Sequence, residues 1–158
     1  MPARPATAAE VRPLRTRILR PGWVDRLATY DADDAPTTFH AAGVLAHDPT
    51  GIIHGTATIY PEPPPSHHLG ALPEAVGKLG VAYRLRGMAT STEARGTGLG
   101  REMLTLCFDH IRESGGRVLW CNARVVAVGF YERMGLQTVG EEFDMPEIGP
   151  HYVMWTEV

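Results

Sequence analysis

The sequence contains no apolar run that approaches the roughly 20 residues a helix needs to cross a bilayer. Residues 1–10 also lack the apolar segment that is typical of a secretion signal. These two absences favour a cytoplasmic protein that does not bind a membrane.

Cysteine is scarce, since Cys107 and Cys121 are the only two in 158 residues. They form no CxxC pair and both lie in apolar stretches, so we expect buried free thiols rather than a disulfide. The seven histidines include no ligand-like spacing that is backed by further ligands. We therefore expect no metal site.

A strong charge of one sign is missing as well, because the formal net charge is only −3, which gives no reason to expect nucleic acid binding. The C-terminal part is acidic around residues 141–147, and the N-terminal part is basic. We interpret the basic part as a solvated helix face, with an interaction arm as the alternative. The hydrophobic share of 44% and the length predict one globular domain, residues 1–158, with residues 1–10 as a frayed tail.

The first half of the chain contains the pattern of a short helix and a hairpin. Apolar spacing and the Pro21-Gly22 stop predict a helix near residues 12–20. Two β-rich runs, residues 37–46 and 52–60, flank an Asp-Pro-Thr-Gly turn and predict an antiparallel hairpin, in which Gly55 marks a bulge or a close approach. The Pro-rich stretch that follows, residues 61–80, is a long loop that either walls an acceptor site or is an inert insertion.

Residues 83–103, YRLRGMATSTEARGTGLGREM, carry the most chemical information. The stretch is strand-like as far as Thr90, becomes rich in glycine, and then has the pattern of a helix. At such a junction the first N–H groups of the helix have no intrahelical acceptor, and glycines let an anion reach them. The helix dipole adds about half a positive charge at the same place. The order of elements therefore predicts a site for a phosphate or pyrophosphate.

The spacing of the glycines excludes two familiar phosphate loops. A P-loop needs Gly-Lys-Ser/Thr, but Gly98 is followed by Leu99-Gly100-Arg101, and a dinucleotide fingerprint fails on its sixth position. What remains is Arg-x-x-Gly-x-Gly, from Arg95 to Gly100. A turn that merely begins a helix is the alternative for this motif taken alone.

A second chemical pattern follows the predicted helix. An apolar stripe from Leu99 to Ile111 and the Gly115-Gly116 stop predict that helix, and the apolar residues 117–122 predict a strand parallel to the previous one. Next come Asn122-Ala123-Arg124 and then VVAVGFYERM-Gly-Leu, residues 125–136. Taken together, the two motifs resemble the acyl-CoA pyrophosphate loop and the second motif of the GCN5-related N-acetyltransferase (GNAT) family.

The resemblance covers residues 83–158, in which residues 137–143 and 151–157 match the family's closing strand pair, whereas residues 1–80 match only in outline. It implies an α/β fold with a central mixed β-sheet, whose two central parallel strands splay apart and whose faces carry helices. It also implies acetyl-CoA as cofactor and acetyl transfer to a primary amine. A small-molecule amine is our working substrate, and a protein N-terminus or lysine is the next possibility.

The resemblance further implies which residues hold the cofactor. The backbone of Met88 and Thr90 pairs with pantetheine while Ala89 turns to the other side, and Asn122 is a polar partner of pantetheine or a helix cap. The pyrophosphate is held by the loop and the first helical turn, which comprise Arg95, Gly96, Thr97, Gly98, Leu99, Gly100 and Arg101.

The resemblance places Tyr131 at the position of the family's general acid. A tyrosine suits this role because a phenol with a pKa of about 10 holds a proton at neutral pH. The alternative is a core tyrosine beside Phe130. Some family members carry a carboxylate on the central strand that acts as general base, but this sequence has Arg84 and Arg86 there. We assign no base firmly; His151 is our choice among several candidates that include Glu62 and His54, and a surface histidine in a turn is its alternative.

Substrate and partners are less determined. The acidic cluster at residues 141–147 would attract a cationic amine, whereas Arg84 and Arg86 would bind an acid group. The second class of function that we consider is a non-catalytic acyl-CoA-binding sensor or interaction module. A homodimer is suggested only by the resemblance, because members of the family often form dimers.

Overall fold

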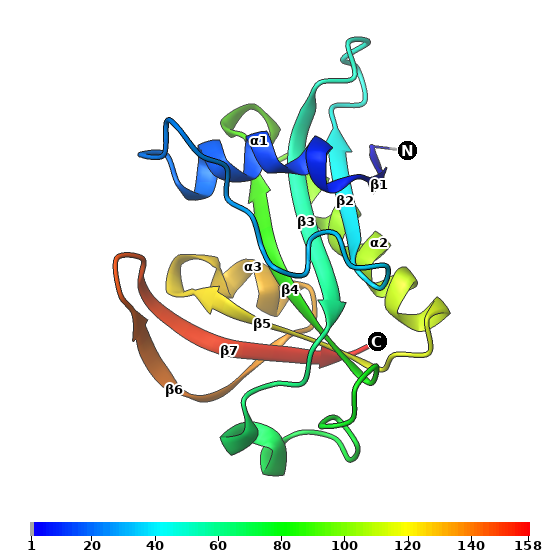
Figure 1. Ribbon diagram of the computed structural model, residues 1–158, viewed down its shortest axis with the longest axis vertical. Helices are drawn as coiled ribbons and strands as arrows, with labels where there is room; N and C mark the ends of the chain where they lie inside the picture. Colours follow the sequence, from blue (N-terminus) through cyan, green and yellow to red (C-terminus); the bar gives the residue numbers. More distant parts are fainter. Residues whose placement is uncertain (1) are drawn as a thin grey trace. The chain divides into compact units, whose positions relative to one another are not determined.

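The computed structural model describes residues 2–158, whose strands form one mixed sheet in the order β1-β2-β3-β4-β5-β7-β6 (Figure 1). Strands β4 and β5 are parallel, as expected, and β5 is antiparallel to β7. The predicted α/β fold with a mixed sheet is confirmed. The strands of the described part are β1 Ala3–Ala6, β2 Phe39–Val44, β3 Ile53–Pro61, β4 Ala82–Thr90, β5 Val118–Arg124, β6 Gln137–Met145 and β7 Gly149–Glu157.

The helices lie between the strands, with additional short turns of 3-10 helix, and α2 lies where the apolar stripe predicts it. The α-helices of residues 2–158 are α1 Ala8–Leu19, α2 Leu99–Glu113 and α3 Val128–Arg133. The 3-10 turns are η1 Ser66–Ala71, η2 Thr92–Ala94 and η3 Val125–Ala127.

The chain divides into two compact units. The first comprises the residues up to Tyr60 together with Arg86–His110, and the second comprises Pro61–Leu85 together with Ile111–Val158. Strand β4 supplies its first residues to the second unit and its last residues to the first unit. That residues 1–158 act as one domain stays a prediction.

The N-terminal segment of the first unit differs from expectation. Residues Ala3–Ala6 pair antiparallel with β2, and α1 begins at Ala8 because Thr7 and Glu10 form a capping box. The Glu10 N–H donates to Thr7 Oγ1 over 3.2 Å, and the Thr7 N–H donates to Glu10 Oε1 over 2.9 Å. The expectations of a frayed tail over residues 1–10 and of a helix start at residue 12 are therefore wrong, while Met1 lies outside the described residues.

The predicted hairpin of the first unit is confirmed as β2 and β3, and two of its glycines lie opposite each other. Gly43 pairs with Gly55, directly before a shift of register at Val44. A Cβ atom at Gly43 would lie 2.6 Å from Leu99 Cγ, and one at Gly55 would lie 2.6 Å from Met103 Cε. The expected close approach at Gly55 is thus confirmed, because helix α2 packs directly on the hairpin there.

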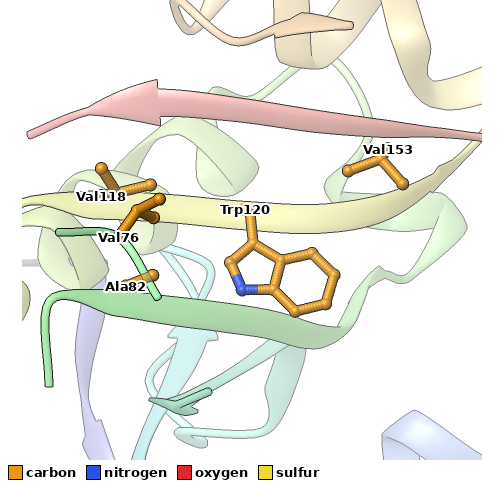
Figure 2. Close-up of a cluster of buried hydrophobic side chains, with 5 residues drawn as sticks. All are labelled: Val76, Ala82, Val118, Trp120 and Val153. Atoms are coloured by element: carbon orange, nitrogen blue, oxygen red, sulfur yellow. The ribbon is translucent and has the colours of Figure 1, made fainter. Parts of the chain in front are cut away.

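The second unit is built around an apolar cluster (Figure 2). The predicted closing strand pair is present as β6 and β7, which are antiparallel, and β7 pairs with β5. The buried members of the cluster are Val76, Ala82, Val118, Trp120 and Val153. Val76 comes from the long loop after β3, so this loop contributes a residue to the core of the second unit.

Both cysteines are buried and free, as expected. Burial raises the pKa of each thiol to about 12, so neither is a thiolate at neutral pH. Within residues 2–158 no helix is both long and apolar enough to cross a bilayer. The same residues contain no cluster of three or more His, Cys, Asp or Glu side chains placed to hold a metal ion.

Candidate functional site

The glycine-rich stretch has the predicted order of strand, loop and helix. Strand β4 ends at Thr90, the 3-10 turn η2 follows, residues 95–98 form turns, and α2 begins at Leu99. These elements form one continuous piece of chain within the first unit. The residues from Met88 to Arg101 therefore lie together because they are contiguous in the chain.

Two loop glycines have backbone conformations that other residues rarely adopt. The φ angle is +76° at Gly96 and +83° at Gly98, both in the left-handed region. A Cβ atom at either position would meet no described atom within 4 Å. The space in front of this backbone is open, so a ligand oxygen can approach the N–H groups where a side chain would otherwise project.

The start of α2 leaves N–H donors for such a ligand. The Glu102 N–H is bonded to the Gly98 carbonyl over 3.1 Å, and the N–H groups of Gly100 and Arg101 precede it in the chain. The Leu99 side chain points the other way, because it is buried against Gly43. Only its backbone can contribute to the site, whereas Arg95 and Arg101 are exposed. The arrangement suits an anion at the N-terminus of a 15-residue helix.

A polar contact beside this loop was not anticipated from the sequence. Ser91 directly follows β4 and is buried, its N–H donates to the His54 carbonyl over 2.7 Å, and its Oγ lies 2.8 Å from His54 Nδ1. The His54 ring also lies within 4 Å of carboxylates of Asp48 and Glu93. These contacts tie the start of the loop to β3, so the loop leaves β4 in a defined direction.

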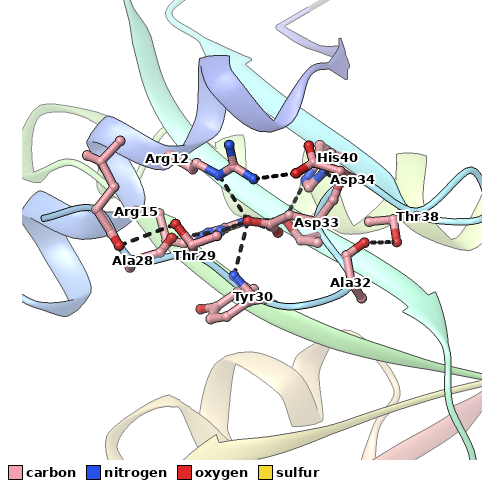
Figure 3. A network of polar contacts seen from close by, with 12 residues as sticks. Arg12, Arg15, Ala28, Thr29, Tyr30, Ala32, Asp33, Asp34, Thr38 and His40 are labelled. Carbon is pink, nitrogen blue, oxygen red and sulfur yellow. Dashed lines mark hydrogen bonds and ion pairs between the residues drawn. The ribbon is translucent and has the colours of Figure 1, made fainter.

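The first unit also contains a buried ionic network (Figure 3). Arg15 is fully buried and donates to Asp33 over 2.9 and 3.2 Å, to the Ala28 carbonyl over 2.9 Å and to Thr58 over 2.7 Å. Burial alone would raise the pKa of Asp33, but hydrogen bonds from Arg15 and from the Tyr30 N–H outweigh it and hold the pKa below its usual value.

The network reaches β4 at Gly87, where φ is +64°. A Cβ atom there would lie 2.8 Å from Arg15 Nε and 3.4 Å from the Tyr30 hydroxyl oxygen. The Gly87 carbonyl accepts a hydrogen bond from Thr56 over 2.8 Å. Strand β4 is thus held in an irregular conformation one residue before Met88. No sequence signal pointed to this network, because its members are far apart in the chain.

Asn122 belongs to the second unit and lies on β5. The recorded pairs of β5 with β4 run from Val118 to Cys121, so Asn122 is the next residue along the strand. Its side-chain Oδ1 is buried and has no hydrogen-bond partner among residues 2–158. A buried acceptor without a donor is costly, and a donor from a ligand would remove this cost.

Tyr131 lies on α3 in the second unit, and only 6% of it is exposed. Its ring packs edge-on against Phe130, with 5.3 Å between ring centroids. This geometry is compatible with both interpretations made from the sequence, a core tyrosine and a proton donor with a shielded hydroxyl.

Arg84 and His151, also in the second unit, each have a partner. Arg84 Nη1 lies 3.0 Å from Glu62 Oε2, and the guanidinium lies 5.2 Å from the centre of the Trp120 ring. His151 is only 4% exposed, so the interpretation as a surface histidine is wrong. The pairing of β7 with β5 and β6 buries it, and its Nδ1 lies 2.8 Å from the Gly149 carbonyl oxygen.

An open hollow of about 430 Å³ lies elsewhere in the first unit, between α1 and residues 21–27. Its lining includes Trp23 and Arg26, and none of the residues predicted from the motifs contributes to it.

Comparison with known proteins adds to this geometry. Residues 73–149 match the model of an acetyltransferase (GNAT) domain. The chain is 37% identical over 142 residues, 90% of its length, to the uncharacterized N-acetyltransferase YitI of Bacillus subtilis (strain 168), of which the match covers 86%.

Solved structures share the fold at low sequence identity. A putative N-acetyltransferase from Lactobacillus plantarum superposes with a TM-score of 0.68 at 19% identity, with 99% of both chains covered. An aminoglycoside 6'-N-acetyltransferase complexed with coenzyme A gives a TM-score of 0.65 at 12% identity, with 99% of this chain and 97% of that one covered.

Proposed function

Since this chain belongs to the GNAT family of acetyltransferases, we propose that it moves an acetyl group from acetyl-CoA to the primary amine of a small molecule, with Tyr131 as the general acid. Membership makes the chain an N-acetyltransferase that uses acetyl-CoA. The class of amine and the roles of individual residues are the proposal. The observation that carries it is the open backbone of Gly96 and Gly98 at the start of α2.

The loop would hold the pyrophosphate of the cofactor. Gly96 and Gly98 leave their surroundings open, and the N–H groups of Gly100 and Arg101 precede the first helical hydrogen bond. The exposed side chains of Arg95 and Arg101 supply positive charge on either side of these glycines. Donors and charge of this kind fit the pyrophosphate, so the residues present suit the group.

The donor arm would lie along β4 beyond Leu85, the last residue of β4 that pairs with β5. We assign the backbone of Met88 and Thr90 to pair with pantetheine, with Ala89 buried toward the opposite side. The unpaired Oδ1 of Asn122 supports its assignment as an acceptor for an amide N–H of the same arm. The interpretation as a helix cap has less support, because no side-chain cap bond is found at the start of η3 or α3.

When bound, acetyl-CoA supplies a thioester carbonyl that the amine attacks. Tyr131 would give its phenolic proton to the departing sulfur, since a phenol with an ordinary pKa of about 10 is protonated at neutral pH. Its position supports this role, because only 6% of the residue is exposed to bulk water. Such a donor typically contributes about a hundred- to ten-thousandfold in rate.

Titration calorimetry with coenzyme A tests the loop assignment, using Gly98→Asp and a matched control. The control is Gly51→Asp, because Gly51 also has a positive φ, +71°, and open surroundings, but lies in the turn between β2 and β3. A carboxylate at position 98 would repel the phosphates, so we expect its affinity to fall at least tenfold, or about 1.4 kcal/mol. Equal affinities for Gly98→Asp and Gly51→Asp would refute the loop assignment.

Thiol release from acetyl-CoA against a panel of amines tests the substrate class. The panel should contain amino acids, diamines, amino sugars and peptides with a free N-terminus. Turnover with any small molecule supports the proposal. Turnover with peptides alone would overturn the small-molecule part and leave the family assignment intact.

A further inference from the structure

Arg86 on β4 has no anionic partner among residues 2–158, in contrast to Arg12, Arg15 and Arg84. Arg12 and Arg15 bind Asp33, and Arg84 binds Glu62. Arg86 is partly buried, and within residues 2–158 it has neither a hydrogen bond nor an ion pair. A guanidinium that is partly removed from water normally acquires an acceptor, so its five N–H donors are available to a ligand.

The one contact recorded for the Arg86 guanidinium is the face of Tyr30, whose ring centre lies 3.8 Å away. A guanidinium that packs over a ring face keeps the N–H groups at its edge free to form hydrogen bonds. An edge presented in this way is the geometry with which arginine binds a carboxylate through two parallel hydrogen bonds.

The Tyr30 platform is itself held in place. The Tyr30 N–H donates to Asp33 over 3.1 Å, and the Asp33 N–H donates to the Tyr30 carbonyl over 3.0 Å. Arg15, which is anchored on Asp33, also lies 4.2 Å from the centre of the Tyr30 ring. The orientation of Arg86 is therefore prepared before a ligand arrives, which lowers the entropic cost of binding.

We propose that Arg86 binds a carboxylate of the acceptor, so that the preferred acceptors are compact amino acids in which one or two carbons separate the amine from the carboxylate. This inference rests on the proposed function, because it uses the assignment of the donor arm to Met88 and Thr90. Arg86 lies two residues before Met88 on β4, so their Cα atoms are at most about 7 Å apart. When Arg86 holds the carboxylate of a short amino acid, the amine of that molecule stays near the donor strand. In a longer acceptor, binding of the carboxylate does not fix the position of the amine.

A single carboxylate suits this site better than a phosphate group. The neighbouring arginines are already neutralised by Asp33 and Glu62, which leaves one positive charge at Arg86 to be matched. A planar carboxylate also fits one guanidinium edge completely. The alternative is that Arg86 only pins Tyr30 against β4, and the experiment separates the two roles.

The first arm of the test measures kcat/KM for free amino acids and for their carboxamides, on the native chain and on Arg86→Gln. For each protein, kcat/KM for the acid is divided by kcat/KM for its carboxamide. The ratio of the native chain is then compared with that of Arg86→Gln, so that intrinsic differences in amine reactivity cancel. We expect the ratio to fall about 10- to 100-fold in Arg86→Gln. Arg86→Lys keeps the charge without the planar fork, and we expect it to lose part of the ratio.

A matched control is Arg26→Gln, because the Arg26 guanidinium also stacks on a ring, that of Trp23 at 3.6 Å. It should leave the acid-to-amide ratio unchanged. If Arg86→Gln slows acids and amides equally, Arg86 is only structural and the proposal is wrong. Equal acid-to-amide ratios in the native chain and in Arg86→Gln, with turnover retained, would overturn it while leaving the proposed function intact.

The second arm needs no turnover. The Arg86 Nε–Hε resonance, identified by its absence from the spectrum of Arg86→Lys, is followed while acetate or acetamide is added to the complex with coenzyme A. We expect a saturable shift with acetate and none with acetamide. A resonance that acetate does not move refutes the carboxylate site. If acetate moves it but no amine of the panel is acetylated, the anion site stands and the small-molecule function fails.

Discussion

The two compact units stabilise their interiors by different means. The first unit, besides its apolar residues, buries the ionic network of Arg15 and Asp33, in which both side chains are 0% exposed (Figure 3). The cluster at the centre of the second unit is apolar, and the single polar group of Trp120 is satisfied by the Glu62 carbonyl over 2.7 Å (Figure 2).

The difference bears on function. Directional hydrogen bonds fix angles as well as distances. The network uses them to hold Tyr30 and the irregular backbone of the proposed donor strand at Gly87. Apolar packing fills volume and tolerates exchange of similar side chains. We therefore expect the first unit to be sensitive to charge and pH, and the second to be sensitive to side-chain volume.

The largest expected effect is on Asp33→Ala. This change leaves the Arg15 guanidinium buried without its counter-charge, which typically costs about 3–5 kcal/mol. Chemical unfolding measures the loss. Asp34→Ala is the control, because Asp34 also pairs with Arg12 but is 82% exposed, and it should lose no more than about 1 kcal/mol. Similar losses for the two variants would contradict the role given to the network.

A smaller loss is expected from Val118→Ala in the apolar cluster of the second unit. Val118 is fully buried, and removing two carbons at about 0.8 kcal/mol each, with a small cavity in addition, should cost about 2 kcal/mol. Equilibrium unfolding in urea measures the value. Because the apolar cluster contains no charged group, the loss in the free energy of unfolding should not depend on pH. A loss that grows as the pH falls would contradict the distinction between the units.

The pH dependence of stability sharpens the comparison further. The folded pKa of Asp33 is depressed, so its contribution to stability is present above the ordinary aspartate pKa of about 3.9 and is lost as pH falls through the folded value. Stability measured between pH 7 and pH 2 should fall less steeply in Asp33→Asn than in the native chain. Val118→Ala should keep the native slope. Identical slopes for all three proteins would exclude Asp33 as a titrating support.

The smallest expected effect concerns the thiols. Because burial raises the pKa of Cys107 and Cys121 to about 12, we expect Ellman's reagent to find no reactive thiol in the folded chain and both after unfolding. The folded protein then adds no background to thiol-release assays. Rapid reaction of either cysteine in the folded state would show that its unit opens readily.

Much of the fold is predictable because its signals are local. The strand–loop–helix order at residues 83–113 and the closing pair after Gly135 follow from apolar spacing and glycine positions within a few residues of each other. The start of α1 was missed although the capping box of Thr7 and Glu10 is also local. Strand β1 could not be found in this way, because it exists by pairing with β2, far along the chain.

The site divides in the same manner. The loop from Arg95 to Gly100 is legible in the sequence, since it is continuous and its glycines have a fixed spacing. The stack of Arg86 on Tyr30 and the contact of Ser91 with His54 are not, because side chains from distant segments meet there only after folding. Both arginines of β4 were noted in the sequence, but only the structure distinguishes the paired Arg84 from Arg86, which has no anionic partner.

The most direct test of the account is the rate of thiol release from acetyl-CoA with a competent amine for Tyr131→Phe, measured beside Tyr83→Phe. Tyr83 is another buried tyrosine of the second unit, 4% exposed against 6% for Tyr131, so both variants remove a hydroxyl from a similar environment. The account predicts that kcat falls about a hundredfold or more in Tyr131→Phe and stays near the native value in Tyr83→Phe. Native rates in Tyr131→Phe would contradict it.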